Sequence, residues 1–206
     1  MTEYSLPYGK SNLKCKIPDS FIIDKLIPDP VQPPTDIESA ISQALANPLG
    51  KRKLSAYSGA NSVGIAINDK TRPVPKPNPL GSLLHYLESN GINRESISLF
   101  VGSGTHTPMT QAELTHILDE EILTRYKVIV HDCDESPMVD LGTTAHHTPI
   151  QINEAFFNCE LKISLGNIEP HHFMGFSGGV KTAVIGLASR ETINANHTML
   201  AHPQAK

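Results

Sequence analysis

The stretch SVGIAINDKTRP, residues 62–73, joins an apolar run to a polar loop. Residues 62–67 have the length and composition of a strand that is buried on both faces of a sheet. Farther along, four leucines follow the i, i+3, i+4, i+7 spacing of a helix packed on such a sheet: Leu80, Leu83, Leu84 and Leu87. The two patterns in succession predict a strand followed by a helix.

The same alternation continues along the chain. Further short apolar runs predict strands at 97–101, 127–130 and 161–165. Helices are predicted over 36–46, after Thr110 and over 150–157. The first two begin with T-x-x-E capping boxes, at Thr35 and Thr110, which satisfy free amides at a helix start. Strands that alternate with helices predict an α/β fold, with a mostly parallel Rossmann-like sheet and helices on both faces.

The first part of the chain has a different pattern. Residues 1–27 alternate loosely and predict short strands. The following segment, IPDPVQPP at 27–34, is too rich in proline for a helix. We therefore expect a β-rich extension with a proline-rich connector at 1–35 and a Rossmann-like domain at 36–206.

Composition limits the function classes. The 206 residues are 39% hydrophobic and 18% charged, which is typical of a globular protein. The net charge is −4 and the basic residues form no stripe, so nucleic-acid binding lacks its main driving force. No apolar run reaches the ~20 residues of a membrane span, and no signal-peptide pattern begins the chain. We expect a cytoplasmic protein that binds neither nucleic acid nor membrane. The widely spaced cysteines, Cys15, Cys133 and Cys159, suggest neither a disulfide framework nor a cysteine zinc site.

Polar loops follow three of the predicted strands and carry Asp69 with Arg72, His106, and His171. Because ligands of open parallel sheets bind outside the carboxyl ends of the strands, we expect these side chains at one edge. The Arg72 guanidinium suits a carboxylate, and Asp69 can orient it or a neighbouring imidazole. Two histidines can exchange roles as proton acceptor and donor near neutral pH. A structural ion pair is the alternative interpretation of Arg72.

The stretch GFSGGVKT, residues 175–182, differs from a nucleotide-binding P-loop at Val180, where the pattern needs glycine. Nine residues separate Gly175 from the predicted strand that ends at Leu165, whereas a P-loop joins its strand directly to a helix. Two interpretations stay open for this stretch: a plain strand-to-helix turn, and the phosphate loop of a P-loop-like nucleotide-dependent transferase.

Ten histidines offer metal ligands. Candidate imidazoles are His146, His147, His171, His172 and His197. None of them has the H-E-x-x-H spacing that places two ligands on one helix face. A further alternative is a non-catalytic module that binds a metal or a carboxylate. We interpret the remaining candidates as surface residues or hydrogen-bonded core residues: His85, His116, His131 and His202.

Four sequence motifs contain most of these candidate residues. They are D-x-T-R-P at 69–73, G-x-H-x-P at 104–108, E-x-H-x-F-x-G-F-S-G-G-x-K at 169–181 and A-N-H at 195–197. Taken together they resemble the N-terminal domain of the nickel-pincer lactate racemase family, which contains 2-hydroxyacid racemases and epimerases. The third motif is the most specific of the four.

The resemblance implies a covalently attached cofactor. In this family a pyridinium thioamide/thiocarboxylate mononucleotide holds nickel as a pincer. By motif position Lys181 would be the attachment site, and His197 would ligate the nickel. Ser177, Gly178 and Gly179 would form the turn that gives the cofactor room.

The resemblance also implies the reaction. His106 and His171 would be the acid–base pair, Arg72 would hold the substrate carboxylate, and Asp69 would support the site. Hydride would pass from C2 of the acid to the cofactor and return to the other face after the keto acid rotates. One base on each side of the substrate is needed for such an inversion.

The implied substrate is a small, lactate-like 2-hydroxy acid. Val180 and Thr105 differ from the residues that are usual at these positions, so a related 2-hydroxy acid is as plausible a substrate as lactate. Implied partners are the cofactor-synthesis enzymes and a C-terminal domain that closes over the site. That domain is absent from these 206 residues, so we expect the chain to be the N-terminal part of the enzyme and inactive alone.

Overall fold

The computed structural model describes residues 1–24, 29–50, 53–75, 78–171 and 175–201. The chain packs as two compact units, Met1–Pro34 and Thr35–Lys206. No helix within the described ranges is long and apolar enough to cross a membrane.

The first unit is a β-hairpin. Strand β1 (Thr2–Tyr8) pairs antiparallel with β2 (Ser11–Ile17), so that Thr2 lies opposite Ile17. Gly9, with φ of 58°, forms the turn between them, where a positive φ suits glycine. The predicted β-rich extension is confirmed.

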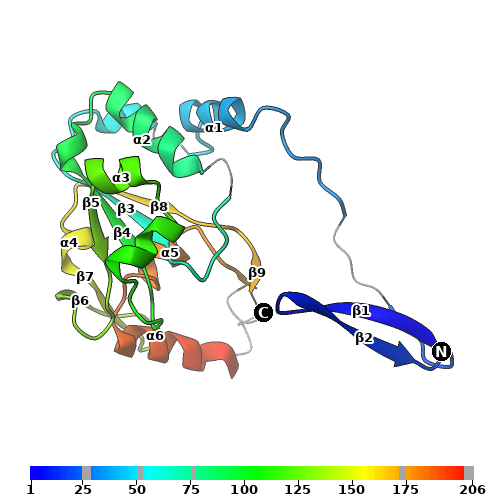
Figure 1. Ribbon diagram of the computed structural model, residues 1–206. Helices are drawn as coiled ribbons and strands as arrows, with labels where there is room; N and C mark the ends of the chain where they lie inside the picture. Colours follow the sequence, from blue (N-terminus) through cyan, green and yellow to red (C-terminus); the bar gives the residue numbers. More distant parts are fainter. Residues whose placement is uncertain (25–28, 51–52, 76–77, 172–174, 202–206) are drawn as a thin grey trace. The chain divides into compact units, whose positions relative to one another are not determined.

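The second unit is built on four parallel strands, β3 (Val63–Asn68), β4 (Ile97–Gly102), β5 (Lys127–Val130) and β8 (Leu161–Leu165). Their order in the sheet is β5-β4-β3-β8, and Figure 1 shows the four strands at the centre of the unit. Val63 pairs with Ile97 on one side and with Leu161 on the other. All four predicted strands are confirmed.

Helices cover both faces of this sheet, as predicted. One face packs against α2 (Pro79–Ser89), the short 3-10 helix η3 (Gln111–His116) and α3 (Glu120–Arg125). The predicted leucine stripe of α2 is buried there against alternate residues of β3, because successive strand side chains point to opposite faces. The other face packs against α4 (Glu154–Phe157) and α5 (Lys181–Val184).

Local sequence sets the helix starts. Helix α1 (Ile37–Ala46) begins at Asp36, whose carboxylate accepts a hydrogen bond from the Ser39 amide at 2.9 Å, so the predicted cap at Thr35 is wrong by one residue. The Thr110 box is confirmed, since Glu113 accepts from the Thr110 amide at 2.9 Å. The helix that follows Thr110 is 3-10. Two further 3-10 helices are η1 (Leu54–Tyr57) and η2 (Arg94–Ser96).

The predicted helix over 150–157 is wrong in its first half. Strand β7 (Pro149–Asn153) occupies this segment and pairs antiparallel with β6 (Met138–Thr143). Ile150 and Ile152 alternate as in a strand, and Asn153 ends the strand by capping α4, where it accepts from the Phe156 amide at 3.1 Å. The helical prediction holds only for the four residues of α4.

The last elements carry the C-terminal motifs. Two-residue strands β9 (Pro170–His171) and β10 (Gly175–Phe176) form a small antiparallel ribbon. Helix α6 (Arg190–His197) begins at the Ser189 cap, continues into the 3-10 helix η4 (Thr198–Ala201) and packs beside β7 (Figure 1).

Candidate active site

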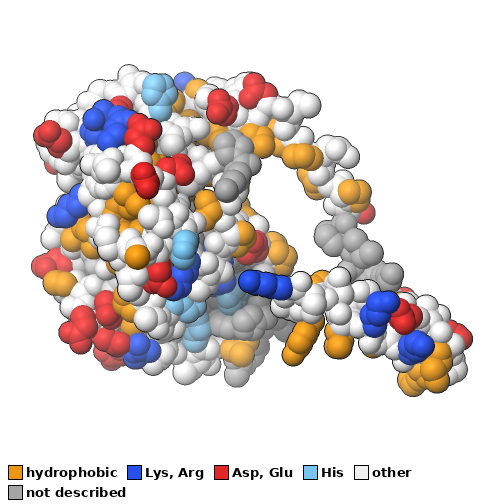
Figure 2. All heavy atoms as spheres, viewed as in Figure 1, with side chains coloured by type: hydrophobic (Ala, Val, Ile, Leu, Met, Phe, Trp, Pro, Cys, Tyr) orange, Lys and Arg blue, Asp and Glu red, His pale blue; other side chains and the backbone are white. Residues whose placement is uncertain are grey.

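A cleft of about 200 Å³ lies at the carboxyl ends of the parallel strands. The sheet order places β4 on one side of β3 and β8 on the other, so the strand order reverses between β3 and β8, where ligands of such sheets bind. The loops after β3, β4 and β8 line the cleft together with α5 and α6. Figure 2 shows histidine side chains gathered beside a basic side chain on one face of the molecule.

Every predicted site residue except Gly179 lines this cleft. The eight residues come from segments about 130 positions apart in the sequence: Asp69, Arg72, His106, His171, Ser177, Gly178, Lys181 and His197. The rule that parallel strands collect their polar loops at one edge therefore brings together the residues that the motifs identified.

Asp69 and His106 form a hydrogen-bonded pair. The His106 Nδ1 atom lies 2.7 Å from Asp69 Oδ2, and a carboxylate can only accept, so Nδ1–H is the donor. Asp69 is 3% exposed, and its other oxygen accepts from the Thr71 amide at 3.1 Å and from the Thr71 hydroxyl at 2.6 Å. In the neutral ring this arrangement leaves the lone pair on Nε2. The buried carboxylate thereby fixes the tautomer of an imidazole that lines the cleft.

Arg72 is half-buried in the loop after β3 and lines the cleft. Its amide donates to the Asp69 carbonyl at 3.3 Å, which closes the turn that aims the side chain. Within the described part of the chain its guanidinium makes no ion pair, so the structural ion pair considered above is not formed there. An arginine in this position is available for a carboxylate ligand.

Lys181 begins α5 and is also half-buried. Burial, and to a smaller extent the nearby Arg72 guanidinium, lower the pKa of the Lys181 ammonium below its ordinary value. Both effects disfavour the charged form. The result is a larger fraction of neutral amine, which is the nucleophilic form.

The turn before Lys181 is held against the connector that follows β8. Gly178 has φ of 72°, and a Cβ atom there would lie 2.3 Å from the Asn167 carbonyl oxygen. The Ser177 hydroxyl donates to the same carbonyl at 2.8 Å and accepts from the Glu169 amide at 3.1 Å. The ribbon of β9 and β10 separates this turn from β8, whereas a P-loop follows its strand directly.

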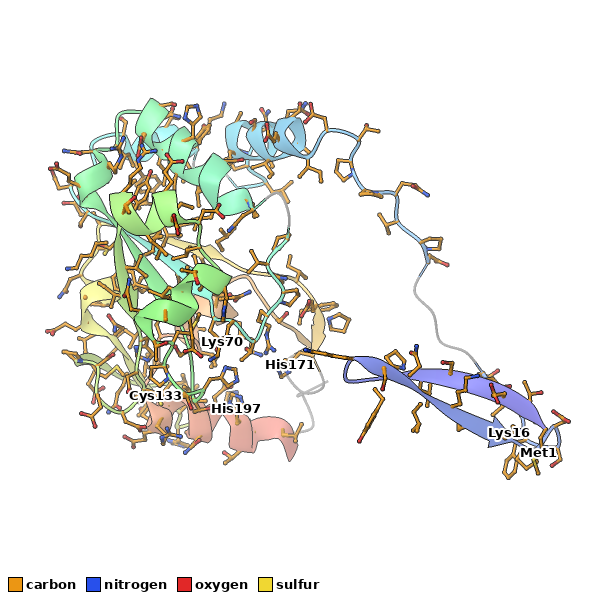
Figure 3. All side chains as sticks on the ribbon, in the orientation of Figure 1. Met1, Lys16, Lys70, Cys133, His171 and His197 are labelled. Atoms are coloured by element: carbon orange, nitrogen blue, oxygen red, sulfur yellow. The ribbon has the colours of Figure 1, made fainter. Side chains whose placement is uncertain are left out.

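His171 and His197 enter the cleft from two different elements. Figure 3 shows His171 on β9 and His197 on α6, and both residues line the cleft. His197 Nδ1 donates to the Ile193 carbonyl at 2.7 Å, one helical turn earlier. This bond fixes the neutral tautomer with its lone pair on Nε2, the usual arrangement of a metal-binding imidazole and its backbone acceptor.

The other histidines have different surroundings. His146 and His147 lie in the exposed turn between β6 and β7 and do not line the cleft, and His172 lies outside the described residues. His131 is fully buried, where it donates from Nε2 to the Ala188 carbonyl at 2.9 Å and accepts from Asn153 at 3.2 Å. Its interpretation as a hydrogen-bonded core residue is confirmed. His85 and His116 are exposed as expected, and His202 lies beyond the described part.

Across the described ranges, one group of three side chains could hold a metal ion, and it consists of Asp132, Cys133 and Asp134. Both oxygens of Asp134 instead accept from Arg190 at 2.7 Å, which ties this loop to α6. His197 belongs to no such group within the described residues.

Sequence reasoning missed several polar residues of the cleft. Ser103 is 2% exposed, and its hydroxyl oxygen has no hydrogen-bond partner among the described residues. Asn68 and Thr182 line the cleft and hydrogen-bond to one another at 3.2 Å. Asn68 and Ser103 lie at or just after strand ends, which was the available signal, but single polar residues there are too common to stand out. Thr182 lies in α5.

The fold and the cleft define a class: a parallel α/β domain with a polar ligand site at the carboxyl ends of its strands. Within this class, the chain belongs to the lactate racemase N-terminal domain family, whose model matches residues 8–206. The family resemblance drawn from the motifs is thereby confirmed.

Two curated relatives are named lactate racemase. The protein from Lactiplantibacillus plantarum is 33% identical over 202 residues, and the match covers 96% of this chain and 47% of the relative. The protein from Thermoanaerobacterium thermosaccharolyticum is 31% identical over 201 residues with the same coverage. The chain thus spans about half the length of the curated relatives it matches.

Solved structures give the same result for the fold. The lactate racemase apoprotein from Thermoanaerobacterium thermosaccharolyticum matches with a TM-score of 0.85 at 31% identity, covering 100% of this chain and 49% of that one. A Thermotoga maritima protein matches with a TM-score of 0.61 at 24% identity, covering 86% and 43%. The second likeness concerns the fold alone.

Proposed function

We propose that this chain is the cofactor- and substrate-binding domain of a racemase or epimerase that acts on a small, lactate-like 2-hydroxy acid. The observation that carries the proposal is the cleft itself, because eight motif residues from distant segments line it. The relatives named lactate racemase support the same activity. Because those relatives are about twice as long, we propose the activity for the whole protein and expect the isolated chain to be incomplete.

We further propose a nickel-pincer nucleotide attached to Lys181, with His197 as a nickel ligand. The residues present fit such a group. The lowered pKa of Lys181 favours the neutral amine that covalent attachment requires, and His197 carries its lone pair on Nε2. The cleft of about 200 Å³ has room for the ring of such a group, since roughly 150 Å³ holds one benzene, and the Ser103 hydroxyl, which has no partner among the described residues, offers that ring's substituents a hydrogen bond. Reversible hydride acceptance from C2 of the acid is the chemistry that this group supplies when bound.

Arg72 would bind the substrate carboxylate through its planar donor fork. The guanidinium makes no ion pair among the described residues, so no internal carboxylate competes with the substrate there. A bidentate contact would also hold the 2-keto acid while it turns its other face toward the cofactor. This is a positioning role, in which binding keeps the reacting atoms in reach.

His106 would move the hydroxyl proton on one side of the substrate. Its Nε2 lone pair can accept the proton of the C2 hydroxyl, and the Asp69 carboxylate at 2.7 Å would stabilise the imidazolium that forms. His171, from β9, would donate and accept the proton on the other side. Separate elements carrying the two imidazoles are consistent with a base on each face, as inversion requires.

Racemisation of enantiopure lactate by the whole protein, followed by chiral chromatography, tests the proposal. His106→Asn and His171→Asn should each slow racemisation at least about 100-fold, the usual contribution of one acid–base group. His116→Asn is the matched control, because His116 is exposed on η3 and does not line the cleft. Unchanged racemisation in either cleft variant would refute the roles of these histidines, and no racemisation of lactate or of any related small 2-hydroxy acid by the unmodified protein after cofactor loading would refute the function.

The cofactor-synthesis enzymes are the proposed partners for that loading. A cytoplasmic location stays a prediction from the sequence.

A further inference from the structure

One residue outside the cleft contacts both of the loops that the proposed reaction needs. Asn167 follows β8 at the strand end beside β3. Its side-chain Nδ2 donates to the Pro73 carbonyl, 94 positions earlier in the sequence, at 2.6 Å. Its own carbonyl accepts from the Ser177 hydroxyl at 2.8 Å. Asn167 therefore joins the Arg72 loop, residues 69–75, to the Lys181 turn, residues 175–182.

The other end of the Asn167 amide makes a second connection to the Lys181 turn. Asn68, at the end of β3, donates from Nδ2 to Asn167 Oδ1 at 3.4 Å. The Thr182 hydroxyl in turn donates to Asn68 Oδ1 at 3.2 Å. The first of these contacts is long and correspondingly weak. The asparagine amide is thus used in both directions, as a donor toward Pro73 and as an acceptor toward Asn68.

The Lys181 turn packs on this connector without spare room. A Cβ atom on Gly178 would lie 2.3 Å from the Asn167 carbonyl oxygen, and one on Gly166 would lie 2.3 Å from the Thr182 hydroxyl. Atoms in such close packing cannot shift independently. A displacement of Asn167 must therefore displace the Lys181 turn as well.

The two loops also carry like charges toward the same cleft. Arg72 and Lys181 both line it, along with Asp69, His106, His171 and His197. The Arg72 guanidinium is near enough to lower the pKa of Lys181, so the two cations repel each other. Uncharged hydrogen bonds through Asn167 hold the loops together against this repulsion.

We propose that Asn167 is a positioning residue that fixes the Arg72 loop relative to the Lys181 turn. The role rests on the proposed function, in which one loop binds the substrate carboxylate and the other carries the cofactor. Asn167 does not line the cleft and acts only through the two loops. A misplacement of about 1 Å between reacting groups can cost about 100-fold in rate, so such a residue matters without touching the substrate.

Two substitutions separate the connections. Asn167→Leu keeps the approximate size but can neither donate to Pro73 nor accept from Asn68. Asn167→Asp keeps the acceptor for Asn68 and loses the donor for Pro73, whose carbonyl would then face a carboxylate. Asn90→Leu is the matched control, because the half-buried Asn90 also donates to a carbonyl, that of Tyr86 at 2.7 Å, at the end of α2.

Hydrogen–deuterium exchange of the full cofactor-free chain tests the proposal. Asn167→Leu should speed amide exchange about fivefold in the Arg72 loop, the fold-change that corresponds to one hydrogen bond of about 1 kcal/mol. Exchange in the Lys181 turn should rise by less, because the Asn167 backbone carbonyl that accepts from Ser177 is kept and only the weak contact through Asn68 is lost. Exchange in β3 and β4 should not change. Asn167→Asp should affect the Arg72 loop, and Asn90→Leu should affect neither segment. Unchanged exchange in the Arg72 loop of Asn167→Leu would overturn the proposal.

Asn167→Leu could also speed exchange in β3 and β4, which would indicate a general loss of stability. In that case Asn167→Asp is the test, and unchanged exchange in the Arg72 loop of Asn167→Asp would overturn the proposal. In the racemisation assay, Asn167→Leu should lower kcat/KM by about 100-fold while mass spectrometry still finds the adduct on Lys181. A loosened Arg72 loop with an unchanged kcat/KM would refute the positioning role. The exchange result does not depend on turnover, so a protein without racemase activity would refute the proposed function and leave the coupling intact.

Discussion

Replacing Gly178 by alanine tests the placement of the Lys181 turn. The new Cβ atom would lie 2.3 Å from the oxygen and 2.7 Å from the carbon of the Asn167 carbonyl, and both atoms belong to the backbone. Overpacking of this kind costs about 1–3 kcal/mol. The φ of 72° adds about 1–2 kcal/mol for a residue with a Cβ atom. We therefore expect Gly178→Ala to lower the free energy of unfolding by about 2–5 kcal/mol.

Gly179→Ala is the matched control. Gly179 has φ of 53°, but its added Cβ atom would meet no heavy atom within 4 Å, so the cost is that of the backbone alone, about 1–2 kcal/mol. Urea unfolding of the two variants gives the difference, about 1–3 kcal/mol in favour of Gly179→Ala. Thermal midpoints should differ in the same direction, by about 2–4 °C per kcal/mol. Equal losses in the two variants would show that the turn does not pack on Asn167 as described.

Two further predictions concern His131 and Asp69. Burial lowers the pKa of His131 in the folded chain, so below about pH 6.5 the unfolded chain binds more protons than the folded chain. The free energy of unfolding should therefore be highest above that pH. Below it, the free energy of unfolding should fall by at most about 1.4 kcal/mol per pH unit. His131→Gln should remove this part of the pH dependence of urea unfolding, whereas the exposed-site variant His85→Gln should keep it. Equal slopes of unfolding free energy against pH in the two variants would contradict the prediction. Asp69→Asn would present an amide donor to His106 Nδ1 and move the ring proton to Nε2, so lactate racemisation should fall about 100- to 10,000-fold while the urea midpoint changes little. Racemisation within a few-fold of the unmodified protein would contradict this role of Asp69.

The sheet could be predicted from the sequence because each of its strands is a short apolar run bounded by polar turns. Residues 63–67 are buried on both faces, so this run contains no polar alternation that could be confused with a surface strand. The helix predicted over 150–157 was wrong because Ile150 and Ile152 pack a two-stranded antiparallel pair, and pairing with β6 is not encoded in the segment itself. Strands β9 and β10 have two residues each, too few to show any period.

The candidate site was predictable where a motif or a strand end marked it. His106 and Arg72 follow strands directly, and the carboxyl-end rule brings their loops together. Asn167 was not predictable, since its contacts to Pro73 and Ser177 depend on how three separate loops meet. Gly179 shares the motif with Gly178, but a Cβ atom added at Gly179 would meet no heavy atom within 4 Å. Only the backbone geometry reveals this difference between the two glycines.

The most direct test of the proposed function is the covalent state of Lys181. The whole protein, co-produced with the cofactor-synthesis enzymes, should carry the added mass of the pincer nucleotide together with nickel, and tandem mass spectrometry should locate the mass on the peptide that contains Lys181. The adduct should be lost in Lys181→Ala and kept in Lys127→Ala, whose side chain is exposed on β5 away from the cleft. An adduct on another residue, or full racemisation by a protein without any adduct, would contradict the assignment of Lys181.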